Sequence, residues 1–122
     1  MGHSVVEHAG TFVELRYTGP VTYEERTAAV DAVSRLLREG GLRKVLADYR
    51  GATVTEIAPG SRIDYIARAI ASDVLQGCHV AMIGLSPEHM RAAEMAGQVR
   101  QIHVKSFDDR DAAIEWLAAH AS

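Results

Sequence analysis

The segment that most constrains the fold is a short apolar run, Val45-Leu46-Ala47, which leads into Asp48, Tyr49, Arg50 and Gly51. A near-continuous apolar run of this length is typical of a strand that is buried on both faces, as in a parallel sheet. In open parallel sheets, ligand-binding residues lie just beyond the carboxyl ends of the strands. The run therefore predicts an α/β fold and nominates Asp48 and Arg50 as candidate site residues.

The rest of the chain alternates between extended and helical patterns. Five strands are expected, over residues 5–8, 11–17, 45–49, 79–85 and 101–107, and about four helices, over 22–40, 61–76, 87–97 and 108–119. Strands that alternate with helices imply parallel strands joined by right-handed crossovers, while the first two strands form an antiparallel hairpin. The sequence thus predicts an α/β fold in the order β-β-α-β-α-β-α-β-α, with a mostly parallel sheet of about five strands.

Turn and capping residues set the expected boundaries. Gly19-Pro20 is expected to break the second strand, because proline lacks a backbone N–H. Thr22 and Glu25 have the spacing of a capping box at the start of the first helix. Asp108 is expected to cap the last helix. The cleanest amphipathic stripe belongs to the second helix and consists of Ile63, Ile66, Ala67, Ile70 and Val74.

Size and charge narrow the class of protein. The chain has 122 residues, which suits one domain, expected from Val5 to Ala119. A net charge of −3 disfavours a general nucleic-acid binder, which should be basic. No apolar run approaches the ~20 residues that span a bilayer. With Cys78 as the one cysteine, no internal disulfide is possible, and a reducing cytoplasm is the simplest location.

Motifs for catalysis or cofactor binding are missing from the sequence. The six histidines have no ligand spacing such as His-x3-His, and Cys78 is expected to be a small buried apolar residue. The glycine-rich phosphate loops and the Gly-x-Ser-x-Gly elbow are also missing. We therefore expect no catalytic residue, no metal, no cofactor and no enzymatic activity.

The candidate binding site consists of Asp48, Arg50, Ser61 and Arg62. Asp48 and Arg50 have the same parity on a strand, so their side chains can share one side of the sheet. Ser61 and Arg62 begin the next helix, where backbone N–H groups attract anions. Two interpretations stay open: a small polar binding site, or a structural pair in which Asp48 accepts loop N–H groups and Arg50 is solvated.

Three segments resemble the SpoIIAA-like branch of the STAS superfamily, small α/β domains that include bacterial anti-sigma-factor antagonists. These segments are Gly19–Glu25, Lys44–Gly51 and the ending Val104–Leu117 with its Trp116. The resemblance covers most of the chain and implies a SpoIIAA-like fold, which is in turn similar to Sec14-type lipid-binding domains. In the antagonists, an Asp-Ser-[Ser/Thr]-Gly-like segment carries the phosphorylated residue. Here Pro59-Gly60-Ser61-Arg62 stands in that place, without the preceding Asp.

Two functions follow as hypotheses. The first is a non-enzymatic, STAS-like protein-interaction or regulatory module, with a protein partner and a free edge strand that could also pair two copies. In that case Ser61 is the phosphate acceptor that the resemblance implies, although the same position suits an ordinary helix cap. The alternative is a carrier of a small apolar molecule or lipid, based on Val54, Ile57, Ile63, Ile66 and Ile70, which otherwise serve as core residues.

Overall fold

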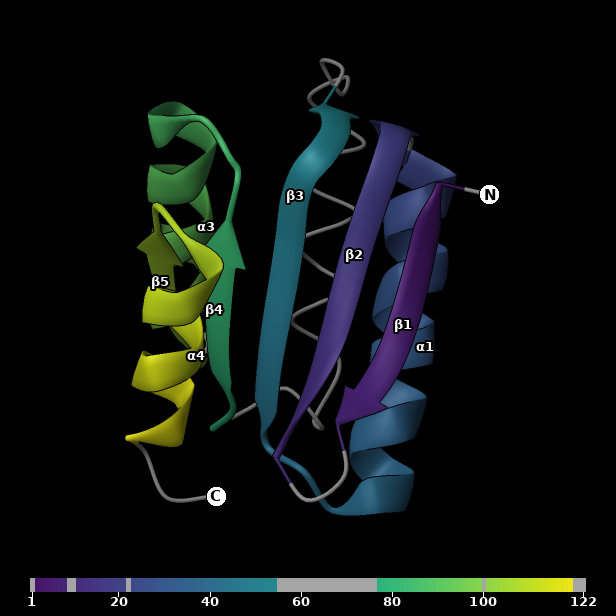
Figure 1. The fold of residues 1–122 in the computed structure, drawn as a ribbon, viewed down its shortest axis with the longest axis vertical. Helices are drawn as coiled ribbons and strands as arrows, with labels where there is room; N and C mark the ends of the chain where they lie inside the picture. The colour runs from purple at the N-terminus through teal and green to yellow at the C-terminus, as the bar shows by residue number, and fades with distance from the viewer. Residues whose placement is uncertain (1, 9–10, 22, 55–76, 100, 120–122) are drawn as a thin grey trace.

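The computed structural model describes residues 2–8, 11–21, 23–54, 77–99 and 101–119. Within them, five strands form one sheet, and three helices pack on its two faces (Figure 1). The strands are β1 (His3–His8), β2 (Phe12–Val21), β3 (Lys44–Val54), β4 (His79–Ile83) and β5 (His103–Phe107). The helices are α1 (Tyr23–Gly40), α3 (Pro87–Val99) and α4 (Arg110–Ala118).

The strands lie in the sheet in the order of the chain, β1-β2-β3-β4-β5. β1 and β2 are antiparallel, with Val5 opposite Leu15, and every later neighbour pair is parallel. The expected five-stranded sheet with an N-terminal hairpin is therefore confirmed. The expected helix over 61–76 lies outside the described residues, and so do Ser61 and Arg62.

The prediction that Gly19-Pro20 breaks the second strand is wrong, because β2 continues to Val21. β1 pairs with β2 only as far as Tyr17, so Pro20 lies beyond this pairing and has β3 as its strand neighbour, opposite Thr53. A strand edge that needs no hydrogen bond accepts a proline. Gly19 has a positive φ of 69°, which suits a residue without a Cβ.

The third strand is longer than predicted and extends to Val54. The sequence suggested that Asp48 and Arg50 lie at or beyond the carboxyl end of this strand. In the structure both lie inside β3. The extension follows from β2, whose Thr18–Val21 segment pairs with Gly51–Val54. On its other side β3 pairs with β4 only as far as Asp48, because β4 ends at Ile83, opposite Asp48.

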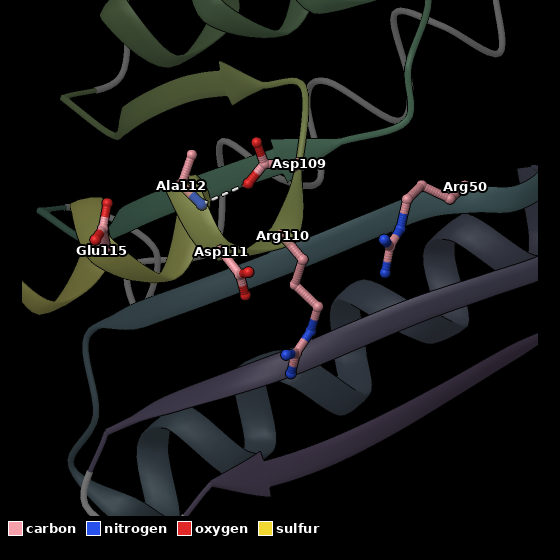
Figure 2. Close-up of a pocket in the computed structure, with 6 residues that line it drawn as sticks. All are labelled: Arg50, Asp109, Arg110, Asp111, Ala112 and Glu115. Atoms are coloured by element: carbon pink, nitrogen blue, oxygen red, sulfur yellow. Dashed lines mark hydrogen bonds between the residues drawn. The ribbon is translucent and has the colours of Figure 1, made fainter.

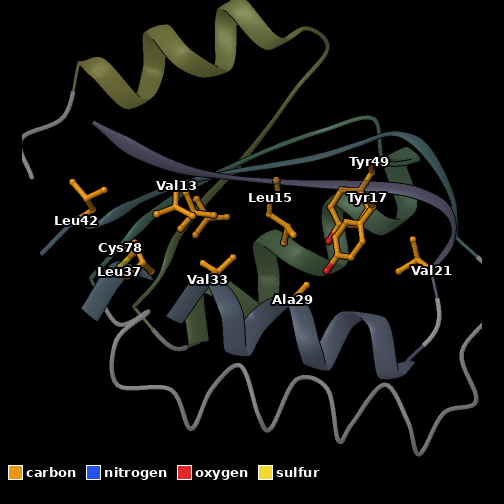
Figure 3. Close-up of a cluster of buried hydrophobic side chains, with 13 residues drawn as sticks. Val13, Leu15, Tyr17, Val21, Ala29, Val33, Leu37, Leu42, Tyr49 and Cys78 are labelled. Carbon is orange, nitrogen blue, oxygen red and sulfur yellow. The ribbon is translucent and has the colours of Figure 1, made fainter. Parts of the chain in front are cut away.

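The two faces of the sheet carry separate cores. On one face, side chains of β2 and β3 pack against Ala29, Val33 and Leu37 of α1 (Figure 3). On the other, Leu46, Ala81 and Ile83 pack against Ala113 and Leu117 of α4. Alternation along each strand sends successive side chains to opposite cores, which is why β3 reads as a continuous apolar run.

The α4 face of the sheet is only partly covered. α4 contacts β3, β4 and β5, whereas α1 lies behind β1 and β2 on the opposite face (Figure 1). Among the described elements, no helix packs over the front of β1 and β2. Nor is any described helix long and apolar enough to cross a bilayer.

The cap of the last helix is shifted by one residue from the prediction. Asp109, not Asp108, is the N-cap of α4, and its side chain accepts a hydrogen bond from the Ala112 N–H at 2.8 Å (Figure 2). An aspartate at either position can supply such a bond, so the sequence did not distinguish them. Thr22, the expected cap of α1, lies outside the described residues. The Glu25 carboxylate accepts a hydrogen bond from the Gly2 N–H and also contacts Nδ1 of His3.

A bulge interrupts β3 where the charged residues lie. Between Arg16 and Thr18 of β2, the paired residues on β3 advance from Asp48 to Gly51, so β3 contains one extra residue. Gly84, just after β4, closely approaches this bulge. A Cβ on Gly84 would lie 2.5 Å from the Arg50 nitrogen, and its φ is 86°. The bulge therefore requires glycine at position 84.

We expect Gly84→Ala to lower the free energy of unfolding by roughly 1–3 kcal/mol from overpacking, with an added cost from the positive φ. Gly41→Ala is the matched control, because Gly41 has a φ of 67° but no atom within 4 Å of the point where a Cβ would lie. Urea denaturation should show a larger loss for Gly84→Ala than for Gly41→Ala. Equal losses would mean that the bulge does not need the close approach.

Candidate functional site

Five charged side chains gather on the uncovered part of the α4 face. Glu14 and Arg16 come from β2, Asp48 and Arg50 from β3, and Arg110 from the first position of α4. We call this group the charged face. It forms because positions 14 and 16, and positions 48 and 50, project to the same side of neighbouring strands, while the Asp109 cap places Arg110 above them.

Glu14 is a buried carboxylate at the centre of the group, with a side chain only 6% exposed. Arg110 donates to it twice, from Nη2 at 2.8 Å and from Nε at 3.2 Å. Arg16 donates from Nη2 at 3.1 Å, and His8 Nε2 lies 2.8 Å from Oε1. Three elements, β1, β2 and α4, therefore meet at this one side chain.

Asp48 is buried in the same way and holds the bulge. Its Oδ1 accepts the backbone N–H of Arg50 at 2.9 Å. The Arg50 side chain donates to the same carboxylate from Nε at 3.1 Å and from Nη2 at 2.9 Å. Arg16 Nε lies 3.7 Å from Oδ2, so Arg16 links the two carboxylates. Asp48 thus satisfies an amide at the bulge and fixes the side chain of Arg50.

Both carboxylates are ionised at neutral pH. The hydrogen bond from Arg110 is the main cause that lowers the pKa of Glu14 to about 2, helped by His8 and Arg16 and opposed by burial. For Asp48, burial is the largest single influence and raises the pKa, but the hydrogen bonds from the Arg50 side chain and backbone outweigh it. The pKa of Asp48 therefore ends below its ordinary value.

The arginines, in contrast, face solvent. The side chains of Arg16, Arg50 and Arg110 are 51%, 49% and 32% exposed, respectively. Three guanidinium groups and two carboxylates leave one net positive charge, and the positive groups are the accessible ones. Arg50 and Arg110 extend in the same direction from β3 and α4 (Figure 2).

Two shallow depressions lie beside Arg50. The first, of about 380 Å³, is lined by Arg16, Tyr17, Thr18, Asp48, Arg50 and Gly51. The second, of about 610 Å³, lies between Arg50 and the start of α4 and is lined by Arg50, Asp109, Arg110, Asp111, Ala112 and Glu115. The first contains two arginines and one buried carboxylate, while the second has three acidic residues on its α4 side.

The structure brings together two of the four predicted site residues, Asp48 and Arg50. Glu14, Arg16 and Arg110 were not predicted from the sequence as site residues. An alternating pattern was visible in β2, but it did not show that Glu14 is buried, and Arg110 lies 96 residues away in the chain. Within the described parts of the chain, no group of three or more His, Cys, Asp or Glu residues could hold a metal ion.

Comparison with known proteins gives a match in structure and none in sequence. No protein-family model and no curated protein matches the sequence. The anti-sigma factor antagonist SpoIIAA in its unphosphorylated form has a TM-score of 0.65 at 9% identity, over 98% of this chain and 99% of that one. The fold is SpoIIAA-like.

Two further structures support the same fold. An uncharacterised protein of the DUF3478 family from Shewanella loihica, described as having a SpoIIAA-like fold, has a TM-score of 0.60 at 16% identity, over 94% of this chain and 91% of that one. The Bacillus cell fate determinant SpoIIAA in the phosphorylated form has a TM-score of 0.59 at 10% identity, over 94% and 98%. The resemblance inferred from the sequence is therefore confirmed at the level of the fold.

The depressed pKa of Glu14 predicts a pH dependence of stability. Because this pKa is about 2 in the folded chain and ordinarily 4.5, the folded state binds fewer protons between these values. The stabilisation, roughly 3 kcal/mol, is present above pH 4.5 and is lost as the pH falls toward 2. Denaturation of wild type and Glu14→Gln should show a stability difference that narrows over this range. Parallel curves would contradict the assignment.

Proposed function

We propose that this chain is a non-enzymatic protein-interaction module with a regulatory role. The observation that carries the proposal is the SpoIIAA-like fold, matched over 98% of this chain and 99% of SpoIIAA. SpoIIAA is described as an anti-sigma factor antagonist, a protein that acts against another protein. The same architecture in this chain supports a role in protein binding, with a partner of its own.

The chemistry of the charged face supports the same proposal. A general base works best when its pKa lies near the working pH, and the pKa of Glu14 is about 2. Its carboxylate, like that of Asp48, is also occupied by arginine donors. Exposed arginines, however, are enriched in protein interfaces. The charged face is therefore better suited to binding than to proton transfer.

Two other expectations from the sequence concern Val54, the last residue of β3, and residues of the segment 55–76, outside the described parts. The carrier hypothesis depends on Val54 and on apolar residues of the segment 57–70, and no observation in the described parts favours it. Phosphorylation of Ser61, with Arg62 beside it, likewise stays a proposal taken from the resemblance. It gives the interaction module a means of regulation, since a phosphate adds negative charge at Ser61, the start of the helix expected from the sequence.

Native mass spectrometry of the chain purified from its own host tests the function. We expect a complex with one other protein in fixed stoichiometry, which re-forms from the purified components. A copurified lipid or metabolite with no protein partner would favour the carrier and contradict the proposal.

Once the partner is identified, its affinity for the Ser61→Asp and Ser61→Ala variants tests the switch. If Ser61 is a switch, the two affinities should differ about tenfold, which corresponds to ~1.4 kcal/mol. Equal affinities would contradict a switch at Ser61 and leave only the helix cap expected from the sequence.

A further inference from the structure

We propose that the depression between Arg16 and Arg50 binds the carboxylate of an Asp or Glu side chain in a short segment of a partner protein. This inference rests on the proposed function, because it names the chemistry that a protein partner presents. It is based on the orientation, immobilisation and accessibility of the arginines on the charged face.

The Arg50 guanidinium keeps one edge available. Arg50 binds Asp48 through Nε and Nη2. A guanidinium has five N–H donors, so the edge formed by Nη1 and Nη2 can still receive a second carboxylate. Among the described residues, this edge of Arg50 has no further partner. Arg50 can thus bind the buried Asp48 and an external acid together.

The arginines are also immobilised in advance. An arginine that is loose in solution loses side-chain entropy when it binds a ligand, and this loss weakens binding. Arg50 is held at three points by Asp48, including its own backbone N–H, and Arg16 lies between Glu14 and Asp48. The two guanidinium groups are therefore ordered before a ligand arrives, although each is about half exposed.

Charge and shape locate the acid on the Arg16 side of Arg50. The carboxylate that lines this depression, Asp48, is 3% exposed, so a ligand meets two positive groups. The depression on the other side of Arg50 is lined by three carboxylates and two arginines, so its net charge is negative and disfavours a negative ligand. A depression of about 380 Å³ that is open to solvent suits one acidic side chain lying on a surface.

The surroundings favour a peptide over a free anion. Val6 on β1 is 52% exposed on the same side of the sheet, opposite Glu14 and two residues from Ser4, the partner of Arg16. Thr18, a polar residue, also lines the depression. A peptide in which an acidic residue is flanked by apolar residues can therefore bind its carboxylate between the two arginines. One of its apolar side chains can then pack on Val6.

The test is a titration of two capped tripeptides, acetyl-Leu-Glu-Leu-amide and its Gln counterpart, into the isotope-labelled full chain, followed by NMR. We expect the Glu peptide to shift the amide resonances of Arg16, Thr18 and Arg50, and to bind at least about tenfold more tightly than the Gln peptide. Arg16→Gln should abolish this preference, while Arg35→Gln, on the exposed side of α1, should leave it intact. Arg50 is not substituted, because it makes both side-chain hydrogen bonds to Asp48, whereas Glu14 keeps its two hydrogen bonds from Arg110 when Arg16 is replaced.

Equal binding of the two peptides, shifts confined to other residues, or a preference that survives Arg16→Gln would overturn the inference. Inorganic phosphate that binds as tightly as the Glu peptide would assign the depression to free anions and also overturn it. The proposed function fails on different evidence, the lack of a protein partner in the host. A partner that binds undiminished to the Arg16→Gln chain would refute this site alone.

Discussion

Two buried carboxylates, Glu14 and Asp48, determine how the α4 face of the sheet is built. An ionised carboxylate that is removed from water is strongly destabilising unless charged donors surround it. Glu14 and Asp48 are 5% and 2% exposed, so Arg110 and Arg50 have to lie against them. The position of the first turn of α4 and the path of the β3 bulge both follow from this requirement.

The same constraint explains why the face divides in two. Where α4 packs, the sheet presents Leu46, Ala81 and Ile83, and water is excluded by apolar contacts. Toward β1 the sheet presents charged groups, and no described helix packs there. Arg110 lies at the boundary, since its backbone belongs to α4 and its guanidinium reaches Glu14 on β2. The helix α4 thus covers the apolar core on this face and also fixes the charged face beside it through Arg110.

Much of the fold could be predicted from the sequence, because it depends on local patterns. The apolar run at Val45–Ala47 indicated a doubly buried strand, and Asp108 indicated the start of α4 to within one residue. The ends of β2 and β3 could not be predicted, because each strand extends only by pairing with the other. Proline at position 20 argues against a strand in isolation, but the observed sheet leaves its nitrogen without a required partner.

The candidate site was harder to predict for a related reason. Asp48 and Arg50 are two residues apart, so their pairing was visible as a possibility in the sequence. Arg110 reaches Glu14 only because β2, β3 and α4 come together in the folded chain. A SpoIIAA-like fold fixes that meeting of backbones, but not which side chains occupy it, and identities of 9–16% leave those side chains to each sequence. The charged face therefore has to be interpreted from this chain's own contacts: its buried acids serve the fold, and the outward edges of its arginines are what it offers to a partner.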